Sequence, residues 1–571
     1  MLPSGLHRPA IARWELATVA ILLTGWLLLS TTLIRRTGVT VDEPSHLLSA
    51  ILYWEGNDRL LPRDMPPLIK IVGGWAAATA GFPIVEESHP VWKTRHEWMI
   101  SLDMMRRMNE DRIRDAMFRA RLPLLVFPVA TALLLWWWGR ELYSPPTAVF
   151  AMLLFLLEPT ALGHAVLFKN DHASAFGFLL FWYMAWRYWK LPTLPSAALL
   201  GFAAALALLA KLSMLILLPI GAVWIIARSR THLRRLVAHL GIAALIAYTL
   251  AIVACQFEVR WWGWIPLPGQ IAHGVGSLVG NARSDNSVYL LGQRYGGGHR
   301  AYFLIAALVK APEVLLLLFL AGLRFAPLLA IPPAIYFAAA SFSSLQFGFR
   351  LILPCLPLAV LVGAAALEHW RSRKWLAPAV LAAMVVPLLI HYPVYLSYFN
   401  FASGGPKRAL RYLSDSNVDW GQDIRQLRHW MQVHNVHRMG VSYLGGDNPL
   451  DYLVHIKKVA LPLFPQFGLE PNVYYIPPIH VPTSFTKQMF GPGVDKAIEV
   501  YRNAPNDQDL TSLLGLFGSS ERIMRKWKRV GDKAIGMDEN GKELVNVPFR
   551  EPIHIRPAYD KLYQITRTSC P

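Results

Sequence analysis

The chain has 571 residues, of which 54% are hydrophobic and only 16% are charged, a composition too apolar for a soluble protein of this length. Its formal net charge of +19 would suit nucleic acid if the cations were clustered. Many of them instead lie in short loops beside apolar runs, as in proteins that contact anionic lipid. Three scattered cysteines exclude a disulfide framework and a cysteine metal site. The composition favours a membrane protein with membrane lipids, and no nucleic acid, among its partners.

Apolar runs long enough to cross about 30 Å of hydrocarbon follow one another through the first part of the chain. They lie at 16–34, 116–138, 147–163, 173–189, 196–210, 212–227, 236–255, 301–323, 325–343, 349–367 and 375–395. No small-residue cleavage site follows the first run, so we expect an uncleaved helix. At Lys211 and Ser213, two short helices and one long tilted helix are alternatives. The runs predict an all-α polytopic membrane bundle of about eleven transmembrane helices.

Basic residues between the runs predict the orientation of the chain. With a cytoplasmic amino terminus, the inside loops contain Arg140, Arg187, Lys190, Arg228, Arg230, Arg234, Arg235, Arg324, Arg371, Arg373 and Lys374. Long loops near 35–115 and 256–300 then lie outside, and so does the tail. We therefore expect a multi-pass cell-membrane protein with an extracytoplasmic carboxyl-terminal segment.

The tail differs in composition from the rest of the chain. It is polar and rich in Pro, Gly, Asp and Asn, with alternating runs at Val441–Leu444 and Val473–Ile476 and helical patterns at Ile424–Val433 and Ser519–Trp527. We predict a small extracytoplasmic α/β domain at 396–571, after a transmembrane domain at 1–395.

Two adjacent carboxylates, Asp42 and Glu43, follow the first apolar run at the predicted outer surface. Carboxylates near lipid are costly and often functional, although Asp before Glu-Pro also suits the start of a helix. A carboxylate can accept the proton of an attacking hydroxyl, which makes Asp42 a candidate general base. Glu43 could orient an acceptor or bind a metal, and His46, one helical turn later, could face the same site or serve structure alone.

A second acidic segment, Gly163 to His172, lies on the same predicted outer face and contains Asp171. Helix packing could bring it to Asp42, where Asp171 would orient the substrate or add loop polarity. His164 is a further candidate for substrate binding. Carboxylate and imidazole also suit Mg²⁺, Mn²⁺ or Zn²⁺, so Glu43, Asp171 and His172 are candidate metal ligands, with no cofactor certain.

Four cations near the outer surface are candidates for binding an anionic substrate. Arg350 is expected to open the tenth helix, and Arg294 and Arg300 flank a glycine-rich loop. That loop lacks the Lys-Ser/Thr of a nucleotide-binding loop. Lys310 lies within an apolar run, where an ionisable residue suggests function and snorkelling to the interface is the alternative. Arginine is preferred where phosphate oxygens are bound.

The motifs occur in an order that resembles bacterial members of the GT-C superfamily, relatives of protein O-mannosyltransferases and aminoarabinose transferases. The similar segments are Asp42-Glu43 with His46, Pro66-Pro67-Leu68, His164 to Asp171, Lys310-Ala311-Pro312, Gly348 to Pro354, Tyr398-Phe399-Asn400, Gly404-Gly405-Pro406 and Asp415 to Asp423. The resemblance extends over about 16–430. This chain departs from the family pattern at Met65, where His is frequent, and at Lys169 and Asn170 beside the second acid.

The resemblance implies a GT-C enzyme of the bacterial inner membrane that transfers a sugar from a polyprenyl-phosphate donor to an acceptor hydroxyl. It implies inversion at the anomeric carbon, with Asp42 as base. The acceptor would be a protein, a lipid or an envelope glycan. A multi-pass transporter or flippase of a lipid-linked saccharide is the alternative, since it also shows intramembrane charges and broken helices. A non-catalytic assembly subunit, with Asp415–Asp423 as a docking or metal-binding loop, is a second alternative.

Overall fold

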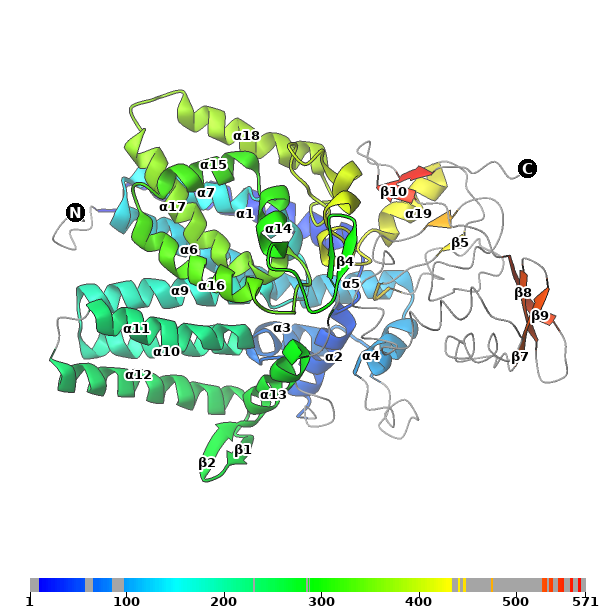
Figure 1. Cartoon of the computed structure of the whole chain (residues 1–571), viewed down its shortest axis with the longest axis horizontal. Coiled ribbons are helices and arrows are strands. Elements are labelled where there is room, and N and C mark those ends of the chain that lie inside the picture. Colours follow the sequence, from blue (N-terminus) through cyan, green and yellow to red (C-terminus); the bar gives the residue numbers. More distant parts are fainter. Residues whose placement is uncertain are drawn as a thin grey trace.

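The structure is a computed structural model of the whole chain. It describes residues 10–56, 65–84, 97–228, 232–283, 286, 288–433, 440–441 and 445–447, together with six short strands from Tyr474 onward. The long helices lie side by side along the longest axis, and strands β7 to β9 lie at the end away from the amino terminus (Figure 1). The described part of the chain is mainly helical.

The helical bundle is built from the apolar runs, and every predicted run is helical over most of its length. Its helices are α1 (Arg13–Arg36), α6 (Val126–Leu142), α7 (Pro145–Leu156), α8 (Pro159–Ala165), α9 (Asp171–Lys190), α10 (Leu194–Ala210), α11 (Leu217–Arg228), α12 (Leu233–Ala254), α14 (Tyr302–Lys310), α15 (Glu313–Gly322), α16 (Pro327–Ser341), α17 (Leu356–His369) and α18 (Leu376–His391). Among the described residues, three helices are long and apolar enough to cross a membrane, or up to five if each bent pair is one span. The count of about eleven spans therefore stays a prediction.

The apolar stretches are interrupted at three places where the backbone leaves the helical region. The run predicted at 301–323 is not one continuous helix: α14 and α15 meet at 115°, because Pro312 lacks an N–H and Ala311 before it is extended. Helices α7 and α8 meet at 64° beside Pro159. Lys211 is extended between α10 and the 3₁₀ turn η4 (Leu212–Ile216), which confirms the two-helix alternative at that position.

The two predicted outer loops contain secondary structure of their own. The first carries α2 (Glu43–Trp54), α3 (Leu68–Ala78), α4 (Glu97–Arg106) and α5 (Glu110–Arg121), which continues through η3 (Leu122–Leu125) into α6. The second carries the hairpin β1 (Val259–Trp262) and β2 (Ile265–Pro268), helix α13 (Gly269–Arg283), and the hairpin β3 (Val288–Leu290) and β4 (Gln293–Tyr295). Helices α2 to α5 share a hydrophobic core with residues of the bundle, among them Leu209 of α10 and Ala251 of α12, and this shared core fixes the start of α2 relative to the bundle.

Residues after α16 include several short 3₁₀ turns. They are η5 (Phe349–Leu351), η6 (Leu353–Cys355), η7 (Pro406–Arg411) and η8 (Asp415–Asn417). Arg350 lies in η5, so the prediction that it opens the tenth helix is wrong: α17 begins at Leu356. The 3₁₀ turn η6, which contains Pro354, separates Arg350 from the helix.

The tail contains one predicted helix and several short strands. Helix α19 (Ile424–Val433) is confirmed, and β5 (Gly440–Val441) pairs in parallel with β6 (Tyr474–Tyr475). Strands β7 (Lys526–Val530), β8 (Lys533–Met537) and β9 (Glu543–Pro548) form an antiparallel sheet, and β10 (Ile555–Pro557) pairs with β11 (Tyr563–Ile565). The helical prediction at Ser519–Trp527 is wrong for Lys526 and Trp527, which are in β7, and residues 519–525 lie outside the described residues.

Candidate functional site

Asp42 is the residue immediately before α2, where the chain turns from the end of α1. Its Oδ2 accepts a hydrogen bond from the Lys169 ammonium at 2.9 Å and lies 3.6 Å from an Arg350 guanidinium nitrogen. The side chain remains 26% exposed, while Lys169 is 3% and Arg350 13% exposed. Residues far apart in the sequence therefore meet around one accessible carboxylate.

Glu43 fixes this carboxylate in place through a buried ion pair. Arg121 of α5 donates to both Glu43 oxygens, at 2.8 and 2.6 Å, and both side chains are fully buried. Glu43 also accepts from the backbone N–H groups of Thr40 at 2.8 Å and Phe168 at 2.6 Å. With these partners the carboxylate is a structural connection between α2, α5 and the Lys169 turn. The catalytic or metal-binding role of Glu43 stays a prediction.

Lys169 lies in the turn between α8 and α9, and its ammonium has a second partner besides Asp42. His46 Nε2 is 2.9 Å from Lys169 Nζ. Burial lowers the pKa of His46 well below its usual value, and the adjacent Lys169 charge lowers it further. The imidazole is therefore neutral, and with the proton on Nδ1 its Nε2 accepts from the ammonium.

Trp420 from the tail provides an aromatic surface for both cations. The Arg350 guanidinium carbon lies 4.3 Å and the Lys169 ammonium 4.9 Å from the centre of its ring, distances at which a cation is attracted to an indole face. The His164 ring meets the same indole edge to face at 6.3 Å. In the sequence Trp420 stands out only as part of the Asp415 to Asp423 segment, and that segment is the available signal for its role.

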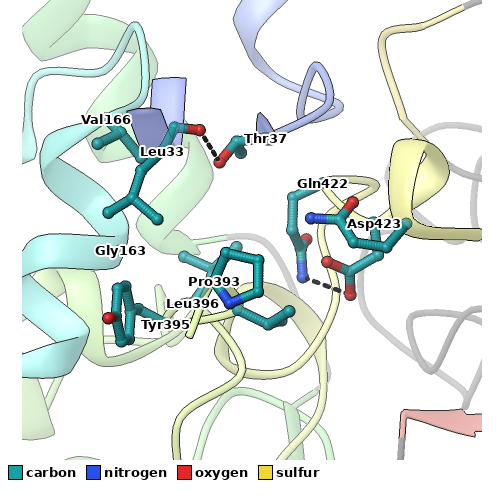
Figure 2. Close-up of a pocket in the computed structure, with 11 residues that line it drawn as sticks. Leu33, Thr37, Gly163, Val166, Pro393, Tyr395, Leu396, Gln422 and Asp423 are labelled. Carbon is teal, nitrogen blue, oxygen red and sulfur yellow. Dashed lines mark hydrogen bonds between the residues drawn. The ribbon is translucent and has the colours of Figure 1, made fainter. Parts of the chain in front are cut away.

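The backbone of the tail is hydrogen-bonded to the segment that leads to Asp42. The N–H groups of Gly38 and Val41 donate to the carbonyls of Gln422 and Trp420, at 2.8 and 3.0 Å. A pocket lies beside this connection, with Leu33, Thr37, Gly163, Tyr395, Gln422 and Asp423 among its lining residues (Figure 2). A Cβ at Gly163 would come within 2.7 Å of the Leu396 nitrogen, so the close approach of α8 requires glycine there.

The second predicted acid, Asp171, is paired with a cation that sequence analysis did not propose as functional. Asp171 Oδ1 accepts from Lys211 Nζ at 2.8 Å, and Asp171 is fully buried. Its Oδ2 has no hydrogen-bond partner among the described residues. Lys211 was noticed in the sequence as an interruption of an apolar run, and that interruption was the available signal for its role.

Lys310 is fully buried and contacts the tail. Its ammonium donates to the carbonyls of Leu396 and Asn417, both at 2.7 Å, and lies 4.9 Å from the Phe399 ring centre. Asn417 in turn accepts from the Phe349 N–H at 2.9 Å, next to Arg350. These contacts connect Lys310 to the tail and to the turn that carries Arg350, and its predicted role in substrate binding stays a prediction.

The other predicted residues whose side chains the structure describes, Arg300 and His172, have other partners than Asp42. Arg300 is exposed, and its guanidinium carbon lies 5.2 Å from the centre of the Phe342 ring. Arg294 is in β4, and its side chain lies outside the described part of the structure. His172 Nε2 donates a hydrogen bond to the Ala161 carbonyl at 2.7 Å. No group of three His, Cys, Asp or Glu residues that could hold a metal ion occurs within the described ranges, so the metal hypothesis gains no geometric support from them.

The site is electropositive around an ionised acid. Burial alone would raise the pKa of Asp42, but the charges of Lys169 and Arg350 and the proximity of His46 outweigh it and lower the pKa to about 2. Asp415, in η8, differs: burial raises its pKa to about 6, although Arg350 opposes this. While Asp415 is protonated, below about pH 6, Lys169 and Arg350 exceed the charge of Asp42 by one. That excess suits the binding of an anion beside an accessible carboxylate.

Residues 104–255 match the family model described as dolichyl-phosphate-mannose-protein mannosyltransferase. A curated relative, the dimethylsulfide dehydrogenase subunit beta of Rhodovulum sulfidophilum, is 32% identical over 78 residues, which are 11% of this chain and 24% of that protein. The chain thus spans about a quarter of that relative's length. So short a match is no evidence that this chain has the relative's activity.

Among solved structures, the match to apo ArnT from Cupriavidus metallidurans covers 94% of this chain and 97% of the ArnT chain, at 13% identity and a TM-score of 0.47. The match to an oligosaccharyltransferase from Archaeoglobus fulgidus covers 79% of this chain and 64% of the oligosaccharyltransferase chain, at 12% identity and a TM-score of 0.41. These likenesses are too distant to assign an activity. The family match confirms the resemblance to protein O-mannosyltransferase relatives for residues 104–255, which include Arg121, Lys169, Asp171 and Lys211.

Proposed function

We propose that this chain is a membrane-embedded glycosyltransferase that takes a sugar from a polyprenyl-phosphate donor. The observation that carries the proposal is the meeting of one accessible carboxylate, Asp42, with two cations, Lys169 and Arg350, at a single oxygen. The family match over 104–255 supports the same reaction class. The acceptor is a hydroxyl of a protein, lipid or envelope glycan on the extracytoplasmic side.

The proposed reaction is a single displacement at the anomeric carbon of the sugar. The acceptor oxygen attacks that carbon, the bond from the carbon to the phosphate oxygen breaks, and its electron pair leaves with the polyprenyl phosphate. The acceptor proton passes to Asp42, whose 26% exposure leaves it reachable from outside. Arg350 stabilises the charge that develops on the phosphate. Because the attack occurs on the side opposite the leaving phosphate, the configuration inverts.

The test is sugar transfer by the purified protein in lipid, with a panel of radiolabelled polyprenyl-phosphate sugars and membrane-derived acceptors. Asp42→Asn preserves the shape of the side chain but removes the base, and we expect transfer to fall by about 10²- to 10⁴-fold. The matched control is Asp111→Asn, the same change at an exposed α5 carboxylate, which should leave transfer unchanged.

A transporter or flippase is the competing function. Such proteins also contain broken helices, like the 115° and 64° breaks of this chain. Absence of transfer by the wild type with every donor, combined with movement of a labelled lipid saccharide between leaflets, would replace the enzyme by a transporter. Full activity of folded Asp42→Asn would retain the enzyme but require a different base.

A further inference from the structure

We infer that Lys169 exchanges partners during the reaction, from the Asp42 carboxylate to the phosphate of the lipid donor. The inference rests on the proposed function and adds a role for a residue at which this chain departs from the related enzymes. Before an anion arrives, the ammonium blocks the base. The donor phosphate is the ligand that draws it away.

The contacts of the ammonium support a mobile, shared cation. Lys169 Nζ is 2.9 Å from Asp42 Oδ2, 2.9 Å from His46 Nε2 and 4.9 Å from the Trp420 ring centre. The neutral imidazole and the indole face attract a cation without neutralising it. Asp42 is consequently the single formal countercharge among these three partners, and an incoming anion competes with it directly.

The charge balance of the reaction favours this exchange. A sugar-loaded polyprenyl phosphate is a diester with one negative charge, and the departing polyprenyl phosphate is a monoester that gains a second. In the same step Asp42 gains a proton and loses its charge. Negative charge therefore moves from Asp42 to the phosphate, and an ammonium placed between them stays paired throughout.

The same exchange makes Asp42 a better base once the donor is bound. A carboxyl with a pKa of about 2 is a weak acceptor for a hydroxyl proton. Transfer of Lys169 and Arg350 toward the phosphate removes the charges that keep the pKa low. The donor therefore activates the base, and the acceptor hydroxyl is not deprotonated productively before the donor binds.

The experiment measures binding of a polyprenyl monophosphate to the full-length protein in nanodiscs, which requires no turnover. Asp42→Asn removes the competing charge, and we expect binding to tighten by about 10-fold. Lys169→Met should weaken binding by about 10-fold, and in the Asp42→Asn/Lys169→Met double variant the tightening should be lost. Lys169→Arg keeps the cation and should preserve the effect of Asp42→Asn, which provides a second test should Lys169→Met misfold.

The matched control is Lys190→Met, since Lys190 also lies over tryptophan rings, at 4.9 Å from Trp189, but outside the site. It should change neither binding nor its response to Asp42→Asn. The exchange would be overturned if Asp42→Asn still tightened polyprenyl monophosphate binding in the Lys169→Met variant. It would also be overturned if Asp42→Asn tightened binding in no variant. Coupled binding in a protein that transfers no sugar would overturn the proposed function while the exchange stands.

A second inference concerns the β1–β2 hairpin and is independent of catalysis. Phe257, Trp261, Trp262 and Trp264 are each at least 67% exposed. The hairpin directly follows α12, a helix long and apolar enough to cross a membrane, and it projects from the edge of the bundle beside α13 (Figure 1). We propose that these aromatic side chains lie in the interfacial region of the outer leaflet.

One hydrogen bond ties the hairpin back to α12. The Tyr248 hydroxyl donates to the Pro266 carbonyl at 2.5 Å, and Tyr248 lies six residues before the end of α12. At about 1.5 Å per residue, the hairpin returns about 9 Å along the helix axis. The indoles therefore lie near the end of a helix long and apolar enough to cross a membrane, and tryptophan is enriched at the membrane–water interface.

The test is a nitroxide spin label at Trp264→Cys in a variant with Cys255, Cys355 and Cys570 replaced by alanine, reconstituted in lipid. We expect faster relaxation by oxygen, which concentrates in lipid, than by a water-soluble nickel chelate. A label at Asp111→Cys, 77% exposed on α5, should show the opposite preference. Nickel access at position 264 equal to that at 111 would overturn the insertion.

Discussion

At the scale of the residue, the site is defined by how a few charges are paired. Asp42 and Glu43 are neighbours in sequence, yet Asp42 is accessible and faces two cations, while Glu43 is buried in an ion pair with Arg121. Asp42 precedes α2 and faces Lys169 and Arg350, whereas Glu43, the first residue of α2, faces Arg121 of α5. Two adjacent acids therefore occupy different environments.

Asp415 gives the site a predicted pH dependence. Its pKa is raised to about 6 by burial, so it is protonated below that pH and gains a negative charge near Arg350 above it. The added charge should repel the donor phosphate, and the donor KM should rise several-fold as pH passes from 5 to 7. In Asp415→Asn the rise should be absent. Initial-rate kinetics across this range checks the expectation, and an unchanged KM profile in the variant would contradict it.

The buried Glu43–Arg121 pair should be a stability determinant. Arg121→Met leaves a fully buried carboxylate without its cation, and removal of one partner from such a pair costs about 3–5 kcal/mol. We expect a marked fall in the thermal midpoint of the detergent-solubilised protein. The exposed change Arg114→Met, on the same helix at 42% side-chain exposure, is the control and should leave the midpoint near that of the wild type.

At the scale of the element, the helices pack through small residues. Gly201 of α10 faces α12, where a Cβ would lie 2.4 Å from the Ala243 carbonyl oxygen. Close approach of helix backbones through small side chains is a principal source of association in membranes. The sequence shows these glycines, but only the packing reveals which of them lie at a helix contact.

A pair of glycine substitutions tests this packing. Gly201→Ala should lower the thermal midpoint, since the added methyl forces α10 and α12 apart at a cost of about 1–3 kcal/mol. Gly241→Ala on α12 has no atom within 4 Å of the new Cβ and should be neutral or slightly stabilising. Equal destabilisation by both would indicate that the effect is not due to the α10–α12 contact.

At the scale of the whole molecule, the tail between residues 396 and 423 completes the site. It supplies Trp420, bonds the segment before Asp42 through Gln422, and is held to α14 by Lys310. The predicted boundary between residues 395 and 396 marks a change in composition, but the first part of the tail packs as a continuation of the bundle.

Removal of the Lys310 ammonium should loosen this part of the tail. Lys310→Met leaves the carbonyls of Leu396 and Asn417 without their donor, at about 1–3 kcal/mol for each buried group. We expect faster protease cleavage between residues 396 and 423 and a lower transfer rate, because Trp420 and Arg350 lose their support. Cleavage mapped by mass spectrometry, with Lys190→Met as control, checks this; wild-type protection in Lys310→Met would contradict it.

The sequence by itself determined the helical, membrane-type character of the chain and most of the helical segments, because apolar run length depends on local composition. It also singled out Asp42 and Arg350 as candidates, since ionisable residues at apolar boundaries are rare. Only the tertiary structure showed that these two side chains meet each other, Lys169 and Trp420, and that Glu43 pairs with Arg121. Ion pairs and cation–aromatic contacts depend on distances between segments that lie far apart in the chain, and no local pattern encodes those distances.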